Sequence, residues 1–461
     1  MVRRSATALA SLTLVVAACG ADETNGVEEA QPADQPEAAE AEAAEADEDG
    51  DTDPEVEPIR VGVLMPLTGF GATAGEEAVR AWELYWEERD YRSGDTPIEV
   101  VYGDSESDAS AGAAEARRLA ESENIDLLIG PIVGAVALAV GDLMEEMGIP
   151  QIYGVPTNDV WLREGMPETL FTIEATTAEM AMHIGRWAAE EAGVQRVATV
   201  CSDYLTGWEA CGGFANTFTT YGGEIVEQIW PPAGGAPDYA PVISRLQAVE
   251  YDALYMGTPV GDGVLFFSAL SEFGLAAETQ ILSHKVVIDP GTLGAYGPDA
   301  VGTLSSAPYA EGRDNAATTA FVEAFEQAYG EIPGTTGGAK YFIAELVDTA
   351  VQRLGGTIPS AEEFISTLHD IEIDDSVYGT WHVDDQGNTI HDHFLREVVD
   401  RGDGTLWDVV TETWPGRGPA YVFEPDAYFA QPPYSQDYQG IGWPTSCGDF
   451  ADPDDCPADL R

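Results

Sequence analysis

The sequence predicts an α/β protein made of two doubly wound, Rossmann-like lobes that are joined by a hinge. Short apolar segments alternate with longer amphipathic segments over residues 59–153, and the alternation starts again at residue 178. This order is typical of parallel sheets with helices on both faces. The chain has 461 residues, enough for two hydrophobic cores, so we expect one sheet in each lobe.

The first lobe is predicted to begin with four strands and three helices. The first helix has Ala78, Trp82, Tyr85 and Trp86 at helical spacing, which predicts an inward apolar face. The expected strands are 59–64, 98–102, 126–129 and 149–153, and the expected helices are 75–89, 109–121 and 135–147.

The second lobe repeats this pattern and is followed by more helices and by antiparallel strands. Its expected helices are 178–192, 207–221, 239–249 and 261–273, and its strands are 196–201, 224–229, 253–256 and 279–282. Helices near 315–329, 338–354 and 361–369 precede strands at 380–383, 389–399 and 405–410, around a turn at 385–388. We therefore expect a first lobe of 59–177 plus about 305–379, a second of 178–304 plus about 380–412, and a surface tail at 413–461.

The N-terminus has the layout of a secretory signal peptide. Arg3 and Arg4 precede an apolar run that ends in small residues before Cys19. The ending V-A-A-C-G resembles the lipobox of bacterial lipoproteins, which implies that Cys19 carries a diacylglycerol and becomes the mature N-terminus. Residues 1–19 would then be the signal, and the protein would be lipid-anchored at the extracellular face of the cytoplasmic membrane. The alternative is a cleaved signal with a chance cysteine.

The segment 20–58 is predicted to be a disordered tether. It contains 16 acidic residues and no basic or aromatic residue, so it cannot form an apolar core. An acidic interaction tail is the other interpretation. The whole chain carries a net charge of −62 and has only two lysines, which argues against nucleic acid as a partner. After Cys19, no apolar run is long enough to span a membrane.

The four remaining cysteines form two local pairs. Cys201 and Cys211 are ten residues apart, and Cys447 and Cys456 are nine apart. An exported chain reaches an oxidising compartment, so we expect two disulfides that close small loops.

The loop after the first strand carries a family resemblance. The string G-V-L-M-P-L-T-G-x-x-A-x-x-G at 62–75, the G-P turn at 130–131 and the segments 237–274 and 388–399 together resemble the extracellular solute-binding proteins of ABC importers, Leu/Ile/Val-binding type, which include amide- and urea-binding members. The resemblance covers about 59–410. It implies the type I periplasmic-binding-protein fold and a monomer without catalysis or cofactor. The protein would bind a small polar solute and deliver it to a membrane permease; the solute would be an amino acid such as a branched-chain one, an amide or urea.

Ligands of open parallel sheets bind beyond the carboxyl ends of the strands, so the candidate site residues follow those ends. They are Phe70, Ser105, Gly134, Ala135, Thr157, Asp203, Tyr204, Thr258 and His284. The resemblance implies that a solute carboxylate lies near the Gly134 and Ala135 amides and the Thr157 hydroxyl. The family often has serine where Gly134 or Ala135 stands, which leaves the solute open.

Asp203 is a candidate partner for an ammonium group, and Tyr204 is a candidate for stacking or hydrogen bonding. Each of these residues also has a structural interpretation. Gly134 and Thr157 are common types in turns and helix caps. Asp203 suits a solvated loop, and Tyr204 suits a core.

Four other functions remain open at this point. Gly69, Gly71 and Gly75 come close to a dinucleotide fingerprint, which would indicate an enzyme. His382, His391 and His393 lie near several aspartates and could bind a divalent metal, or they could form a polar hairpin face. A hydrolase lacks motif support, because neither G-x-S-x-G nor H-E-x-x-H occurs. A ligand-binding sensor would share the fold of a transport protein.

Overall fold

The computed structural model describes residues 56–461, except 158, 259 and 286. The predicted signal peptide, Cys19 and nearly all of the predicted tether lie outside the described residues. Within the described ranges, every helix is too short or too polar to traverse a lipid bilayer.

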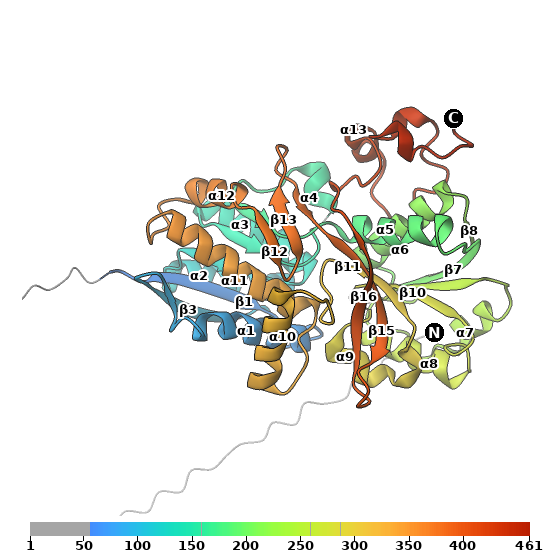
Figure 1. Ribbon diagram of the computed structural model, residues 1–461. Coiled ribbons are helices and arrows are strands. Elements are labelled where there is room, and N and C mark those ends of the chain that lie inside the picture. Colours follow the sequence, from blue (N-terminus) through green and yellow to red (C-terminus); the bar gives the residue numbers. More distant parts are fainter. Residues whose placement is uncertain (1–55, 158, 259, 286) are drawn as a thin grey trace, which may run out of the picture. The chain divides into compact units, whose positions relative to one another are not determined.

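The first lobe is built on a six-stranded sheet in the order β2-β3-β1-β4-β5-β6 (Figure 1). Strands β3, β1, β4, β5 and β6 are parallel, and only β2 is antiparallel. The strands are β1 (Ile59–Met65), β2 (Arg92–Ser93), β3 (Thr96–Asp104), β4 (Leu127–Ile129), β5 (Gln151–Tyr153) and β6 (Leu170–Thr172), and the helices between them are α1 (Ala72–Glu87), α2 (Ala109–Ser122), α3 (Gly134–Met147) and α4 (Asp159–Glu164).

The predicted inward face of the first helix is confirmed. Ala78, Trp82, Tyr85 and Trp86 are all buried on α1. They share one hydrophobic core with the apolar side chains of β1 and with three later helices. Those helices are α10 (Ala316–Tyr329), α11 (Thr335–Arg353) and α12 (Ala361–His369). The first lobe is therefore completed by chain that follows the second lobe in sequence.

The second lobe contains a seven-stranded sheet in the order β16-β15-β11-β10-β9-β7-β8. Strands β7 to β11 are parallel, and β15 and β16 extend the sheet in antiparallel fashion. The strands are β7 (Arg196–Cys201), β8 (Glu224–Ile229), β9 (Ala253–Gly257), β10 (Gln280–His284), β11 (Leu304–Ala307), β15 (His393–Asp400) and β16 (Leu406–Trp414).

Helices cover both faces of this second sheet (Figure 1). Helices α5 (Thr177–Glu190) and α6 (Leu205–Thr220) pack on one face. Helices α7 (Ala240–Leu246), α8 (Val260–Glu272) and α9 (Pro290–Tyr296) pack on the other face. The predicted pair of doubly wound parallel sheets is therefore present in the structure.

The chain crosses between the lobes three times. Residues 173–176 lead from β6 to α5, and residues 308–315 lead from β11 to α10. The third crossing is at Asp392, which separates β14 (Thr389–His391) from β15. Our prediction of one continuous strand at 389–399 was wrong, because β14 pairs with β13 whereas β15 pairs with β11.

A small third sheet contains β12 (Ile373–Ser376), β13 (Gly379–Val383) and β14. We expected residues from about 380 onward to belong to the second lobe. Trp381 is instead fully buried in the core of the first lobe, and it packs edge-on against Phe342 of α11. The second lobe therefore regains the chain only at β15.

The residues after β16 pack on α5 and α6. Val422, Phe423 and Phe450 share a hydrophobic cluster with Ala178 and Met182. This tail includes the helix α13 (Pro425–Phe429) and the 3₁₀ turns Cys447–Asp449 and Pro453–Asp455; a third 3₁₀ turn, Pro298–Ala300, follows α9. The tail thus packs over helices of the second lobe and buries apolar side chains of its own.

Candidate functional site

The two parallel sheets share one topology. Among the parallel strands, β1 lies between β3 and β4 in one sheet and β7 lies between β8 and β9 in the other, so the strand order reverses beside β1 and beside β7. Loops that leave neighbouring strands at such a reversal go to opposite faces of the sheet, which leaves a crevice at the carboxyl ends. Helices α1 and α3 begin there in the first lobe, after β1 and β4, and helices α6 and α8 begin there in the second, after β7 and β9.

Helices α3 and α6 begin without a side-chain cap. Val133 precedes α3 and Tyr204 precedes α6, and neither side chain accepts a hydrogen bond from the first turn. Side chains of Asp108, Thr176 and Asn315 cap α2, α5 and α10, whereas α1, α7 and α11 also begin without a side-chain cap. The Gly134 and Ala135 amides of α3 find no acceptor among the described residues. An uncapped helix start with free N–H groups is suited to binding an anion.

Phe70 lies in the loop that links β1 to α1, and it is 82% exposed. The Asp104 carboxylate holds this loop, because it accepts hydrogen bonds from the amides of Leu67 and Thr68 and from the Thr68 hydroxyl, at 2.7–3.2 Å. An exposed aromatic ring on a fixed loop is available for contact with a solute or with the other lobe.

In the second lobe, Asp203 and Tyr204 lie together at the start of α6. Burial raises the pKa of Tyr204 to about 12, so its hydroxyl keeps the proton at neutral pH and can donate a hydrogen bond. Asp203 is exposed, and its carboxylate accepts a hydrogen bond of 2.9 Å from the Trp208 indole. The Sγ atoms of Cys201 and Cys211 lie 1.92 Å apart, which closes the loop that carries both residues.

The other candidate residues are buried in the structure. Thr157 donates its hydroxyl hydrogen to the Glu174 carbonyl at 2.6 Å, and its amide donates to the Ala175 carbonyl. Its hydroxyl is therefore committed to the first crossing segment rather than to the start of α3. Ser105, Thr258 and His284 are also buried, and each has a side-chain polar atom without a partner among the described residues.

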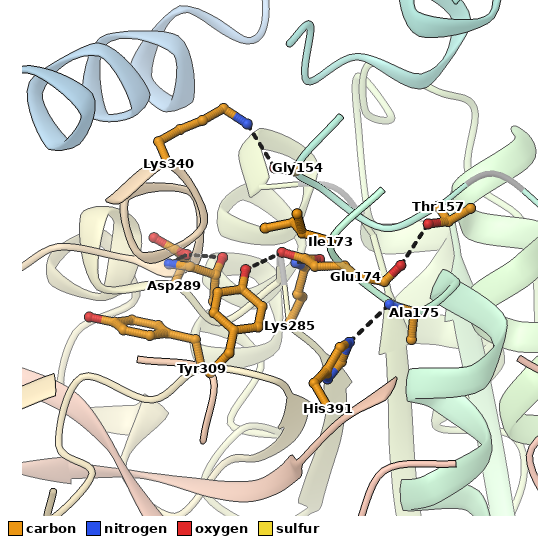
Figure 2. Close-up of polar contacts among 12 residues, drawn as sticks. Gly154, Thr157, Ile173, Glu174, Ala175, Lys285, Asp289, Tyr309, Lys340 and His391 are labelled. Carbon is orange, nitrogen blue, oxygen red and sulfur yellow. Dashed lines mark hydrogen bonds and ion pairs between the residues drawn. The ribbon is translucent and has the colours of Figure 1, made fainter. Parts of the chain in front are cut away.

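Sequence reasoning missed a buried ion pair between the first crossing segment and the second lobe. The Glu174 carboxylate pairs with the ammonium group of Lys285 (Figure 2). The same carboxylate accepts a hydrogen bond from the Tyr378 hydroxyl. All three side chains are at most 3% exposed. Glu174 thus links Lys285, which follows β10 of the second lobe, to Tyr378 of the first.

The second lysine lies in the same region. Lys340 of α11 is fully buried, and its Nζ atom donates to the Gly154 carbonyl at 2.8 Å (Figure 2). Lys285 and Lys340 are the only lysines of the chain, so both are buried in a protein with a net charge of −62. The small number of lysines was the sequence signal that could have identified these buried residues. We interpreted it only as part of the acidic composition.

A second buried ion pair lies beside the second crossing segment, residues 308–315, and one of its members is hydrogen-bonded to that segment. Arg396 of β15 lies 3.2 Å from the Asp408 carboxylate, and both side chains are fully buried. The Arg396 guanidinium also donates to the carbonyls of Tyr309 and Ile288. Nearby, the Asp289 carboxylate accepts hydrogen bonds of 2.9 and 2.7 Å from the amide and the hydroxyl of Thr335, at the start of α11. The lobes are therefore joined by charged side chains as well as by chain.

The predicted histidine trio does not form one ligand set. His382 is half-buried on β13, and the Nε2 atom of His391 accepts a hydrogen bond of 3.0 Å from the Ala175 amide. His393 lies on the other side of the crossing at Asp392 and begins β15. The rings of His391 and His393 are still neighbours, with centroids 4.6 Å apart.

The structure explains why glycine stands at positions that resemble a dinucleotide fingerprint. A Cβ atom on Gly75 would lie 2.1 Å from the Pro66 carbonyl oxygen, so glycine lets α1 approach the end of β1. Gly69 has a φ of +86°, which favours glycine at that turn. These positions are explained without a bound phosphate.

The fold and the paired helix starts define a two-lobe solute-binding protein. The model of the family described as "Periplasmic binding protein" matches residues 58–403, so the chain belongs to that family.

Individual relatives agree with this assignment. The chain is 27% identical over 377 residues to a protein of Brucella melitensis named "Leu/Ile/Val-binding protein homolog 6", with 78% of this chain and 92% of the relative covered. It is similar to the solved structure of an ABC-transporter solute-binding protein from Rhodopseudomonas palustris in complex with 3,4-dihydroxybenzoic acid (TM-score 0.73, 26% identity, 78% of this chain and 99% of that one). It also shares its fold with the leucine-binding protein LivK of Thermotoga maritima (TM-score 0.67, 20% identity, 77% and 99% covered).

The buried Lys340 predicts a pH dependence of stability. Burial lowers the pKa of Lys340 from 10.5 to about 7. Between these pH values the unfolded chain holds a proton that the folded protein has released, so stability increases as the pH rises through this window. We expect the free energy of unfolding to rise from pH 7 to pH 10 more steeply in the wild type than in Lys340→Met, by an amount on the order of a few kcal/mol.

Urea denaturation of both proteins at several pH values tests this expectation. The difference between the two proteins is the relevant quantity, because tyrosines titrate in the same range and contribute equally to both. Parallel curves for the wild type and Lys340→Met would show that Lys340 keeps an ordinary pKa.

Proposed function

We propose that this protein captures a small carboxylate-bearing solute between its two lobes and delivers it unchanged to an ABC permease. The single observation that carries the proposal is the uncapped start of α3, where the Gly134 and Ala135 amides have no acceptor among the residues that the structure describes. A solute carboxylate would satisfy those amides and would interact favourably with the helix dipole. Family membership supports the transport role.

The aromatic side chains near the helix starts indicate the remainder of the solute. Phe70 extends from the first lobe, and Tyr204 and Trp208 lie at the start of α6. Flat or branched apolar groups pack well on such rings. Amino acids, including branched-chain ones, are therefore the first candidates, and aromatic carboxylates are the second. The relatives' names and titles, which include a Leu/Ile/Val-binding homolog and a dihydroxybenzoic acid complex, agree with both classes.

Urea and simple amides fit this site less well. They lack the negative charge that a helix start with free amides favours. The exposed Asp203 carboxylate supplies the opposite charge in the second lobe, where it is suited to an ammonium group. A solute with both charges, such as an amino acid, would use both lobes and would favour their closure.

The remaining features complete the proposal. Cys19 would anchor a monomer to the outer face of the cytoplasmic membrane, with residues 20–58 as tether. Both cysteine pairs would be disulfides, in agreement with sulfur separations of 1.92 Å in each. The protein would bind its solute without catalysis and without a cofactor.

A thermal-shift screen tests the proposed solute class. The panel contains amino acids, hydroxybenzoates, simple amides and urea. A ligand that binds only the folded protein at about 100 times its Kd adds about 2.7 kcal/mol to the free energy of unfolding. We expect one carboxylate class to raise the Tm. A rise with urea alone would contradict the role of the α3 start, and a protein that hydrolyses or oxidises its ligand would contradict the binding role.

Phe70 provides a more specific test of the same site. We expect Phe70→Ala to weaken binding of the best ligand by about three- to tenfold, because an aromatic contact contributes about 0.5–1.5 kcal/mol. Stability should change little, since the ring is 82% exposed. Isothermal titration calorimetry measures the affinity. The control is Phe273→Ala, which removes another exposed ring after α8 and should leave the affinity unchanged.

A further inference from the structure

Five buried polar atoms lie without partners at one place in the second lobe. They are both carboxylate oxygens of Glu179, the Nε2 atom of His183 and both ring nitrogens of His393. The three residues are 0%, 3% and 1% exposed, and no described residue forms a hydrogen bond with any of the five atoms. Buried polar groups are normally paired, so this concentration indicates a missing partner.

The geometry brings these side chains to one point. Glu179 and His183 are one turn apart on α5, so they share a helix face. His393 faces them from the first position of β15. One donor atom from each of the three residues lies within 4.8 Å of the other two. The imidazole rings of His183 and His393 are stacked with centroids 4.2 Å apart, so both rings lie in one place beside the Glu179 carboxylate.

The charges around the cluster leave room for a cation. Arg186 pairs with Glu190 and Asp455, and Arg417 pairs with Asp455. Lys285 pairs with Glu174. The neighbouring cations are therefore already paired with other carboxylates, whereas the Glu179 carboxylate has no partner among the described residues.

We propose that Glu179, His183 and His393 bind one divalent transition-metal ion of the zinc type. Two imidazole nitrogens and one carboxylate oxygen form a donor set that Zn²⁺ prefers, and they leave a fourth tetrahedral position for water.

The position of the cluster gives the ion a structural role. Helix α5 begins directly after the first crossing segment, and β15 begins directly after the third crossing at Asp392. A metal bound by all three residues would therefore tie together two of the connections that leave the first lobe. This role does not depend on which solute the protein binds.

Metal analysis of the purified protein tests the proposal. The protein is treated with a chelator, titrated with Zn²⁺ in excess Ca²⁺, separated by gel filtration and analysed for zinc. The Ca²⁺ occupies acidic surface sites, which prefer hard cations, so that only an imidazole site retains zinc. We expect one zinc per chain, and we expect Co²⁺ in its place to show the visible absorption of a four-coordinate site. Substoichiometric zinc in the folded wild type would overturn the proposal.

Matched variants locate the ion. We expect Glu179→Gln and His393→Gln to weaken zinc binding by at least about tenfold, since even the loss of a residue that only orients a ligand costs that much. The control His382→Gln alters a half-buried histidine outside the cluster and should bind zinc like the wild type. Equal losses in His382→Gln and His393→Gln would refute the assignment.

The position of the ion can also be measured in the wild-type protein, without any variant that could fail to fold. Anomalous diffraction from wild-type crystals soaked in zinc should place the ion at bonding distance from Glu179, His183 and His393. An ion found only at other residues would overturn the proposal.

Discussion

Replacing Lys285 with methionine will lower the free energy of unfolding by about 3–5 kcal/mol, the usual cost of removing one partner from a buried ion pair. Lys285 is 2% exposed, and its ammonium group is the charged partner of the Glu174 carboxylate. The variant leaves that carboxylate buried with the Tyr378 hydroxyl as its remaining side-chain donor. Urea denaturation of the wild type and the variant measures the difference.

Two further variants test whether the loss of stability comes from the unpaired Glu174 charge. Glu174→Gln combined with Lys285→Met removes both charges, so we expect the double variant to be more stable than Lys285→Met alone. Arg60→Ala breaks an exposed ion pair with Glu99 and should cost less than about 1 kcal/mol. A Lys285→Met protein as stable as Arg60→Ala would show that the buried pair contributes little.

Placing an acid at the start of α3 will separate solute binding from stability. We expect Ala135→Asp to weaken binding of the carboxylate solute by about a hundredfold, or about 2.7 kcal/mol. The new carboxylate would occupy the free amides and repel the solute. The same charge interacts favourably with the helix dipole, so stability should stay equal or rise by about 0.3–1 kcal/mol. Titration calorimetry and urea denaturation measure the two quantities.

The matched control lies one turn further along the same helix. Ala139 is also exposed, but its amide is inside α3, so Ala139→Asp adds the same charge away from the free N–H groups. We expect its affinity for the solute to stay near that of the wild type. Equal affinities of Ala135→Asp and the wild type would move the carboxylate site away from the α3 start.

The sequence predicted the elements of the fold well where local periodicity determines them. The strand–helix alternation led to both parallel sheets, and the apolar spacing on α1 identified its buried face. The crossing at Asp392 was not predictable in this way. His391 and His393 form one alternating pattern in sequence, but their strands pair with partners in different sheets.

Prediction of the candidate site was less complete. The positions where α3 and α6 begin were predicted because a strand end followed by a helix is a local signal, and their role in binding stays a prediction. The hydroxyl group of Thr157 was expected to face the solute, and it instead donates to the Glu174 carbonyl. The prediction failed because Thr157 forms a β-bridge with Thr176 in the first crossing segment. No pattern in the sequence indicates that pairing.

The sequence by itself determined the two-lobe architecture, the acidic composition and the positions at which the helices begin, because each follows from neighbouring residues. Only the tertiary structure decided which buried charges meet. Glu174 and Lys285 are 111 residues apart, and Glu179 lies more than 200 positions before His393. Contacts at such separations depend on how three crossings return the chain to each lobe, and the energies of buried charges depend on those contacts.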